Sequence, residues 1–140
     1  SFLKIYFILI IMGKHIGLHC TWDIYGGDST KLSYVPFISK VLHSTIDNLN
    51  LKKIEASFKQ FDPIGVTGFI LLEESHISIH TWPEHGFAAV DVFSCNDFDV
   101  DLVSTYLSEI LEADRVETNV IKRGVLPKKA TLSINEESET

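Results

Sequence analysis

Cysteine and positive charge are both scarce in this chain, and each shortage excludes a class of protein. Two cysteines, Cys20 and Cys95, are too few for the disulfide framework of a small secreted domain. We therefore expect free thiols in a reducing, cytoplasmic compartment. Lysine and arginine number 12 against 19 aspartate and glutamate, for a net charge of -7. This balance lacks the basic face that nucleic-acid binding requires, so no nucleic-acid partner is expected.

Long apolar segments are also missing. The most apolar stretch, residues 1–12, is shorter than the roughly 20 residues that span a bilayer. No small-residue cleavage site of a signal peptide follows it. We interpret residues 1–11 as an apolar, non-native extension before a natural start at Met12, in preference to a membrane anchor. The remaining length fits one domain, residues 12–127, followed by a polar tail, residues 128–140.

Hydrophobic periodicity predicts an α+β fold. Alternating apolar residues indicate half-buried strands, and apolar residues three or four apart indicate helices. The sequence predicts strands at 15–24, 53–61, 68–72, 77–82, 87–95 and 115–122, and helices at 35–49 and 100–111. We expect a two-layer sandwich, a mainly antiparallel sheet with two helices on one face. The other face is left open, and a partner subunit is one way to cover it.

The most informative segment runs from Glu74 to Cys95. A serine hydroxyl can attack the preceding carbonyl, here that of Glu74, and convert the amide into an ester. Removal of the serine α-proton then cuts the chain by β-elimination. This chemistry needs a base and a donor to the carbonyl oxygen. His80 is the candidate base and Thr67 the candidate donor.

The turn at residues 83–86, which contains Pro83 and Gly86, predicts a hairpin between the two strands of this segment. In that hairpin, residues whose numbers sum to 169 or 170 face each other. Ser75 then lies about 5 Å from Ser94 or Cys95. Strict alternation places His80 on the opposite face from Ser75, unless the strand bends or bulges near Ser75. The spacing leaves these alternatives open.

Taken singly, these residues have ordinary structural interpretations. A serine at a strand edge usually has no function, and Cys20 alternates toward the core. His76 and His80 would lie about 13 Å apart on a strand, too far to share a metal ion. We therefore expect no metal, although a metal-binding module built on the histidines remains a competing hypothesis.

Taken together, the residues resemble the self-processing segment of the small, prokaryotic-type S-adenosylmethionine decarboxylase proenzymes. The shared pattern is Glu-Ser-His, then His-Thr-Trp-Pro-Glu, then Gly-Phe-Ala-Ala-Val-Asp-Val-Phe and a cysteine. The resemblance implies cleavage between Glu74 and Ser75, into a β chain ending at 74 and an α chain starting at 75. Ser75 would become a covalent pyruvoyl cofactor that forms a Schiff base with the substrate, without pyridoxal phosphate. His80 would act in processing and Cys95 as the proton donor.

The resemblance also implies a substrate and an assembly. Glu84 would hold the ribose hydroxyls and Phe61 would stack on adenine, in homodimers with sites at the subunit boundary. The reaction would convert S-adenosylmethionine to S-adenosyl-methylthiopropylamine and CO2 for spermidine synthesis. Thr67 stands where the family usually has serine. Two alternatives remain: a pyruvoyl-dependent arginine or ornithine decarboxylase, and an unprocessed regulatory homologue.

Overall fold

The structure, a computed structural model, describes residues 14–127. The expectations for the extension at 1–11 and the tail at 128–140 lie outside these residues. The elements in chain order are β1 (His15–Tyr25), α2 (Ser29–Ser33), α3 (Val35–Asn48), β2 (Lys53–Gln60), β3 (Val66–Leu72), β4 (Ser75–Trp82), the 3-10 turn η1 (Pro83–His85), β5 (Phe87–Ser94), α4 (Val100–Ile110) and β6 (Arg115–Val125).

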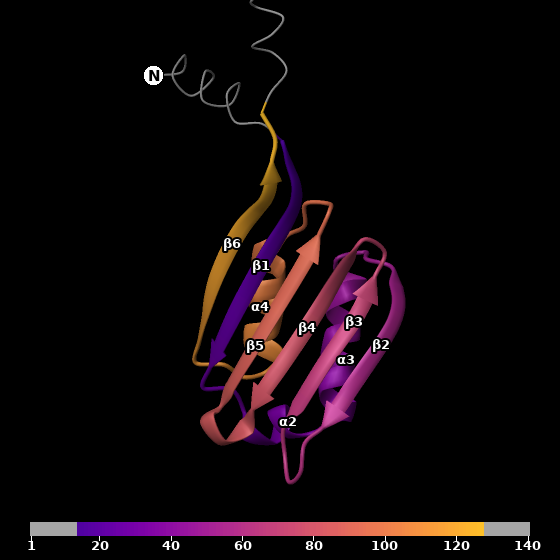
Figure 1. Ribbon diagram of the computed structural model, residues 1–140. Coiled ribbons are helices and arrows are strands. Elements are labelled where there is room, and N and C mark those ends of the chain that lie inside the picture. Colours follow the sequence, from indigo (N-terminus) through magenta and orange to yellow (C-terminus); the bar gives the residue numbers. More distant parts are fainter. Residues whose placement is uncertain (1–13, 128–140) are drawn as a thin grey trace, which may run out of the picture.

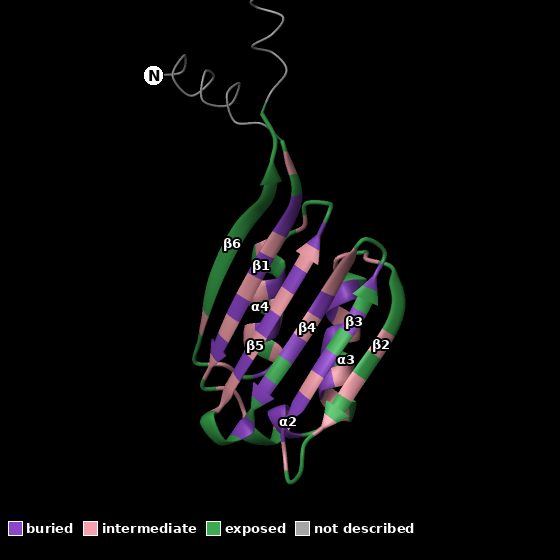
Figure 2. Ribbon diagram, viewed as in Figure 1, coloured by how far each residue is buried: buried purple, intermediate pink, exposed green. Residues whose placement is uncertain are grey.

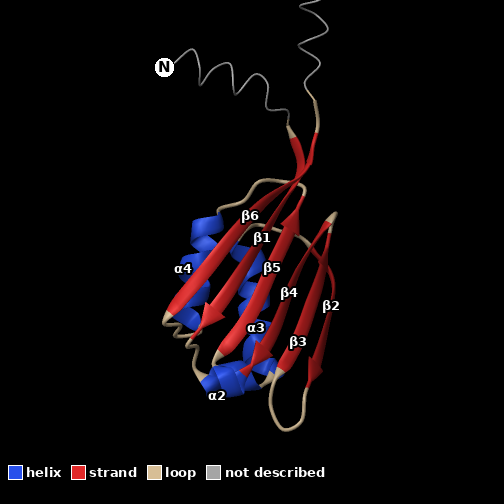
Figure 3. Ribbon diagram, turned by 60° about the vertical axis from the view of Figure 1, so that its left-hand side comes forward, coloured by secondary structure: helices blue, strands red, loops and turns tan. Residues whose placement is uncertain are grey.

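The strands form one antiparallel sheet in the order β2-β3-β4-β5-β1-β6 (Figure 1). Helices α3 and α4 pack side by side against the same face of this sheet, as the turned view shows (Figure 3). This arrangement confirms the predicted α+β sandwich with two helices on one face. The short helix α2, which is capped by the Asp28 side chain, was not predicted.

The hydrophobic core lies between the sheet and the two long helices. Alternate residues of the central strands point into it, so that buried and less buried positions follow each other along each strand (Figure 2). In β5, Ala88, Val90 and Val92 are buried against the helices. From the helices, Leu42 of α3 and Leu107 of α4 are fully buried. The period of two in the strands therefore sorts the sheet into a core face and a helix-free face.

The helix-free face carries large apolar side chains without a covering layer. Phe69, Leu71 and Trp82 are each 41% exposed on this face. Exposed apolar groups gathered on one sheet face are typical of an interaction surface. No helix within residues 14–127 combines the length and apolar character needed to cross a bilayer.

Candidate active site

Ser75 begins β4 immediately after a tight turn. Leu72 of β3 pairs with Ser75, and Glu73 and Glu74 make the connection between the strands. Glu74 has a φ of 57°, in the left-handed region that costs a residue with a side chain about 1–2 kcal/mol. The Ser75 hydroxyl donates to the Glu73 carbonyl oxygen at 3.1 Å. The Glu74–Ser75 peptide bond therefore lies at the rim of the sheet, next to a strained residue.

Cys95 follows the end of β5 and lies beside Ser75. The β4–β5 register pairs His76 with Phe93, so Ser75 comes opposite Ser94. This confirms one of the two predicted registers. Ser75, Cys95 and Glu74 line one cavity of about 330 Å³. The Cys95 thiol donates to the Glu74 carboxylate at 3.5 Å. We call Glu74, Ser75 and Cys95 the serine half-site.

The two cysteines have different surroundings. Both are free thiols, Cys20 buried and Cys95 exposed. Burial raises the pKa of the Cys20 thiol, which keeps its proton in the core. Of the two cysteines, only Cys95 borders the cavity that Ser75 lines.

A second group of candidate residues lies at the other end of β4. Thr67 of β3 pairs with His80 of β4, and the Thr67 hydroxyl lies 3.0 Å from His80 Nδ1. Thr67, His80, Phe61 and Glu84 line a second cavity of about 280 Å³. The Phe61 side chain is 46% exposed, which makes its ring available for stacking. We call these four residues the histidine half-site.

The two half-sites are separate within one protomer. Ser75 and His80 are five residues apart on a regular strand, a distance of about 16 Å. The β3–β4 register runs without a shift from Thr67 to Leu72, so no bulge brings them closer. The two cavities share no lining residue. Neither His80 nor Thr67 can reach Ser75 of the same chain in this arrangement.

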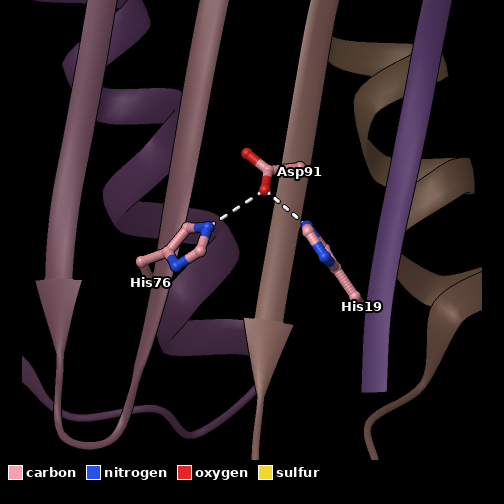
Figure 4. Close-up of side chains that lie close together, drawn as sticks. All are labelled: His19, His76 and Asp91. Atoms are coloured by element: carbon pink, nitrogen blue, oxygen red, sulfur yellow. Dashed lines mark hydrogen bonds and ion pairs between the residues drawn. The ribbon is translucent and has the colours of Figure 1, made fainter. Parts of the chain in front are cut away.

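A third cluster, not foreseen from the sequence, lies on the helix-free face (Figure 4). His19 Nε2 and His76 Nε2 lie 2.7 and 3.0 Å from the same oxygen of Asp91, Oδ2. The Ser78 hydroxyl donates to Asp91 Oδ1. Burial raises the pKa of Asp91, but the hydrogen bonds from Ser78, His19 and His76 outweigh it and hold that pKa below its usual value. From the sequence, His76 was considered only together with His80, and neither His19 nor Asp91 was singled out.

We compared the chain with known proteins to identify its family. The sequence profile described as S-adenosylmethionine decarboxylase matches residues 18–124. This chain belongs to that family. The match includes Ser75, His80 and Cys95 together with both cavities.

Individual decarboxylases of the family support the assignment. The S-adenosylmethionine decarboxylase proenzyme of Sulfurihydrogenibium is 44% identical over 117 residues, covering 83% of this chain and 88% of that protein. The corresponding proenzyme of Persephonella marina is 42% identical over 123 residues, covering 86% and 92%. The crystal structure of the adenosylmethionine decarboxylase from Aquifex aeolicus has a TM-score of 0.75 and 39% identity, covering 84% of this chain and 98% of that one. These matches favour an adenosylmethionine decarboxylase over the arginine or ornithine decarboxylase left open above.

Proposed function

We propose that this chain is a self-cleaving, pyruvoyl-dependent decarboxylase that converts S-adenosylmethionine to S-adenosyl-methylthiopropylamine and CO2. The product is the aminopropyl donor for spermidine synthesis. The observation that carries the proposal is the serine half-site: a serine that is preceded by a left-handed glutamate and shares a cavity with an exposed thiol. The free thiols also agree with the cytoplasmic location that we propose.

The position of Ser75 supports self-cleavage at this residue. Its hydroxyl oxygen attacks the Glu74 carbonyl carbon, the carbon–nitrogen bond breaks, and an ester forms. A base removes the Ser75 α-proton, and β-elimination releases Glu74 as the carboxylate end of the β chain. The dehydroalanine that remains takes up water and releases ammonia, which leaves a pyruvoyl group on the α chain. The left-handed backbone at Glu74 favours the reaction because cleavage relieves it.

The residues of the serine half-site suit a pyruvoyl group at position 75. Such a group supplies an electrophilic carbonyl that condenses with an amine and draws electrons from the bond to the departing carboxylate. Cys95 borders the same cavity and carries its proton toward Glu74. After CO2 leaves, the Cys95 thiol donates its proton to the carbon that lost the carboxylate. The chemistry so described needs neither pyridoxal phosphate nor a metal ion.

The histidine half-site supplies the groups for recognition and for processing. The Glu84 carboxylate accepts hydrogen bonds from the two ribose hydroxyls, and the exposed Phe61 ring stacks on adenine. His80 serves the proton transfers of self-cleavage, and the Thr67 hydroxyl sets the orientation of its ring.

We further propose that the active enzyme is a homodimer joined through its helix-free faces. A two-fold axis between the two sheets and perpendicular to β4 exchanges the ends of the strand. It thereby places the serine half-site of one protomer against the histidine half-site of the other. The separation of about 16 Å within one chain and the exposed side chains of Phe69, Leu71 and Trp82 support this arrangement. A complete site then contains residues from both protomers.

The intact mass of the denatured protein tests the proposal. We expect two chains that split between Glu74 and Ser75, the second lighter by one ammonia than a chain that begins with serine. Ser75→Ala is the control and stays uncut. Release of labelled CO2 from carboxyl-labelled S-adenosylmethionine, but not from arginine or ornithine, then establishes the substrate. A single uncut wild-type chain overturns the proposed decarboxylase and favours an unprocessed regulatory homologue.

A further inference from the structure

His19, His76 and Asp91 belong to neither half-site. They come from three neighbouring strands: His19 from β1, Asp91 from β5 and His76 from β4. Their nearest nitrogen and oxygen atoms all lie within 4.8 Å of one another. The three side chains point toward a common point on the helix-free face (Figure 4). The sheet therefore brings together three side chains of the kinds that bind metal ions. The decarboxylation described above assigns no role to any of them.

The two imidazole rings are held in place by their neighbours. His76 stacks between Phe69 and Phe93, with ring centroids 5.3 and 6.1 Å away and interplanar angles of 21° and 22°. His19 stands edge-on to Phe93 at 5.6 Å and to His76 at 5.9 Å. The His19 side chain is 20% exposed and the His76 side chain is 31% exposed. Rings fixed by packing on rigid strands lose little entropy when they bind a ligand.

The carboxylate is oriented as well. Ser78 holds Asp91 Oδ1, which leaves Oδ2 to face both Nε2 atoms. Outer hydrogen bonds of this kind orient the ligating carboxylates of metal sites. Two imidazoles and one ionised carboxylate form the donor set of zinc sites that keep an open position, and of non-haem iron sites.

We propose that His19, His76 and Asp91 bind one divalent transition-metal ion of the zinc class, through the two Nε2 atoms and Oδ2. Ligands of a tetrahedral ion with bonds of about 2.0–2.1 Å lie about 3.3–3.4 Å apart. The present separations of 2.7 and 3.0 Å from Oδ2 open by a few tenths of an ångström to admit the ion. The fourth position faces the helix-free side, toward the space between the two sheets of the proposed dimer, where a water molecule completes the coordination.

Arg123 competes with the metal ion for His19. Its Nη1 lies 3.0 Å from His19 Nδ1, and its guanidinium group lies 5.8 Å from the centre of the Phe93 ring. Because arginine only donates, His19 Nδ1 carries no proton and Nε2 carries it instead. Metal binding at Nε2 moves that proton to Nδ1, and Arg123 must then turn away. Arg123 lies on the edge strand β6 and is exposed, so it is free to do so. Substitution of Arg123 by a residue without a positive charge therefore favours the metal-bound state.

The test is a Zn²⁺ titration of the chelator-stripped full chain, in competition with a chromophoric chelator. We expect one Zn²⁺ per protomer, that is, per pair of β and α chains, and a visible absorption band of four-coordinate Co²⁺ when Co²⁺ replaces it. Asp91→Asn and His19→Gln each weaken binding by more than about 100-fold, beyond the effect of outer-shell changes. Arg123→Ala strengthens binding about fivefold, because one competing positive charge is gone.

His43→Gln is the matched control, because His43 lies on α3 and contacts Ser39 and Lys53 away from the cluster. This variant keeps the wild-type affinity. Circular dichroism of each variant separates a lost ligand from a lost fold, and His19→Gln serves if Asp91→Asn does not fold. Ser75→Ala binds Zn²⁺ as the wild type does, so the result is independent of processing. A wild-type stoichiometry below one, or unchanged affinity in both ligand variants, overturns the proposal.

Discussion

Thr67 and His80 face each other across β3 and β4, with the threonine hydroxyl 3.0 Å from His80 Nδ1. This contact engages the Nδ1 nitrogen of the His80 ring. Compared with serine, threonine carries an extra methyl group, which restricts the rotation of the hydroxyl. Substitutions at Thr67 can therefore be used to test the proposed role of His80.

Substitution at Thr67 tests that role. Thr67→Val keeps the shape and removes the hydroxyl, so we expect self-cleavage to slow by at least about tenfold as His80 loses its orientation. Thr67→Ser keeps the hydroxyl and cleaves at least as fast as the wild type. A time course of precursor and product chains on a denaturing gel measures both rates. Equal rates in the valine variant and the wild type contradict a role for this pair in processing.

Cys95→Ala separates cleavage from turnover. Because Cys95 acts in our scheme only after CO2 has left, this variant still splits at Glu74/Ser75. Its decarboxylation slows by about 100-fold or more, which is the usual loss when a general acid is removed. Intact mass reports the cut, and CO2 release reports turnover. Cys20→Ala is the control: it lowers stability through a small core cavity and leaves turnover per folded molecule unchanged.

Mixed dimers test the composite site. Cys95→Ala and His80→Ala are each inactive as homodimers, because every site contains the changed residue. When the two variants are co-expressed in equal amounts, half of the dimers contain one copy of each. Each mixed dimer has one unaltered site out of two, so about a quarter of wild-type activity returns.

Its control mixes two variants of one half-site, Ser75→Ala with Cys95→Ala, which cannot build an unaltered serine half-site in any dimer. Recovery only in the first mixture supports sites shared between protomers. Absence of recovery in a mixture shown to contain mixed dimers places each complete site within one chain.

The ionised Asp91 carboxylate contributes to the stability of the fold, and this contribution depends on pH. Its pKa is lowered in the fold, so its contribution is fully present above its unfolded pKa of about 4 and is lost as pH falls through the folded value. At pH 7 we expect Asp91→Asn to be less stable by about 2 kcal/mol. Urea unfolding at a series of pH values from 7 to 3 measures this difference. The difference should shrink below about pH 4; a constant difference would show that the charge of Asp91 is not its source.

The elements that the sequence predicted correctly are those fixed by local chemistry. The turn at 83–86 determined the β4–β5 register, so the closeness of Ser75 and Cys95 could be predicted from the hairpin alone. The apolar spacing of α3 and α4 likewise indicated both long helices. Helix α2 was missed because its five residues are too few for a periodic pattern.

Long-range pairing set the features that the sequence could not reveal. His19 and Asp91 are 72 residues apart, and they meet only because β1 pairs with β5. The alternation of residues correctly placed His80 and Ser75 on opposite faces of the strand. The local sequence does not predict, however, which face of the sheet joins two protomers in the proposed dimer. The residue types were visible in the sequence, whereas their grouping depended on strand order.

The strand order also decides what a cut at Glu74/Ser75 does to the molecule. Strands β1, β2 and β3 then belong to one polypeptide and β4, β5 and β6 to the other, yet β1 lies between β5 and β6. Three strand contacts, β3–β4, β5–β1 and β1–β6, cross from one polypeptide to the other. The fragments are interleaved, and separating them means dismantling the sheet. A single-chain precursor folds in a first-order reaction, whereas the mature enzyme, once denatured, must recombine in a second-order one.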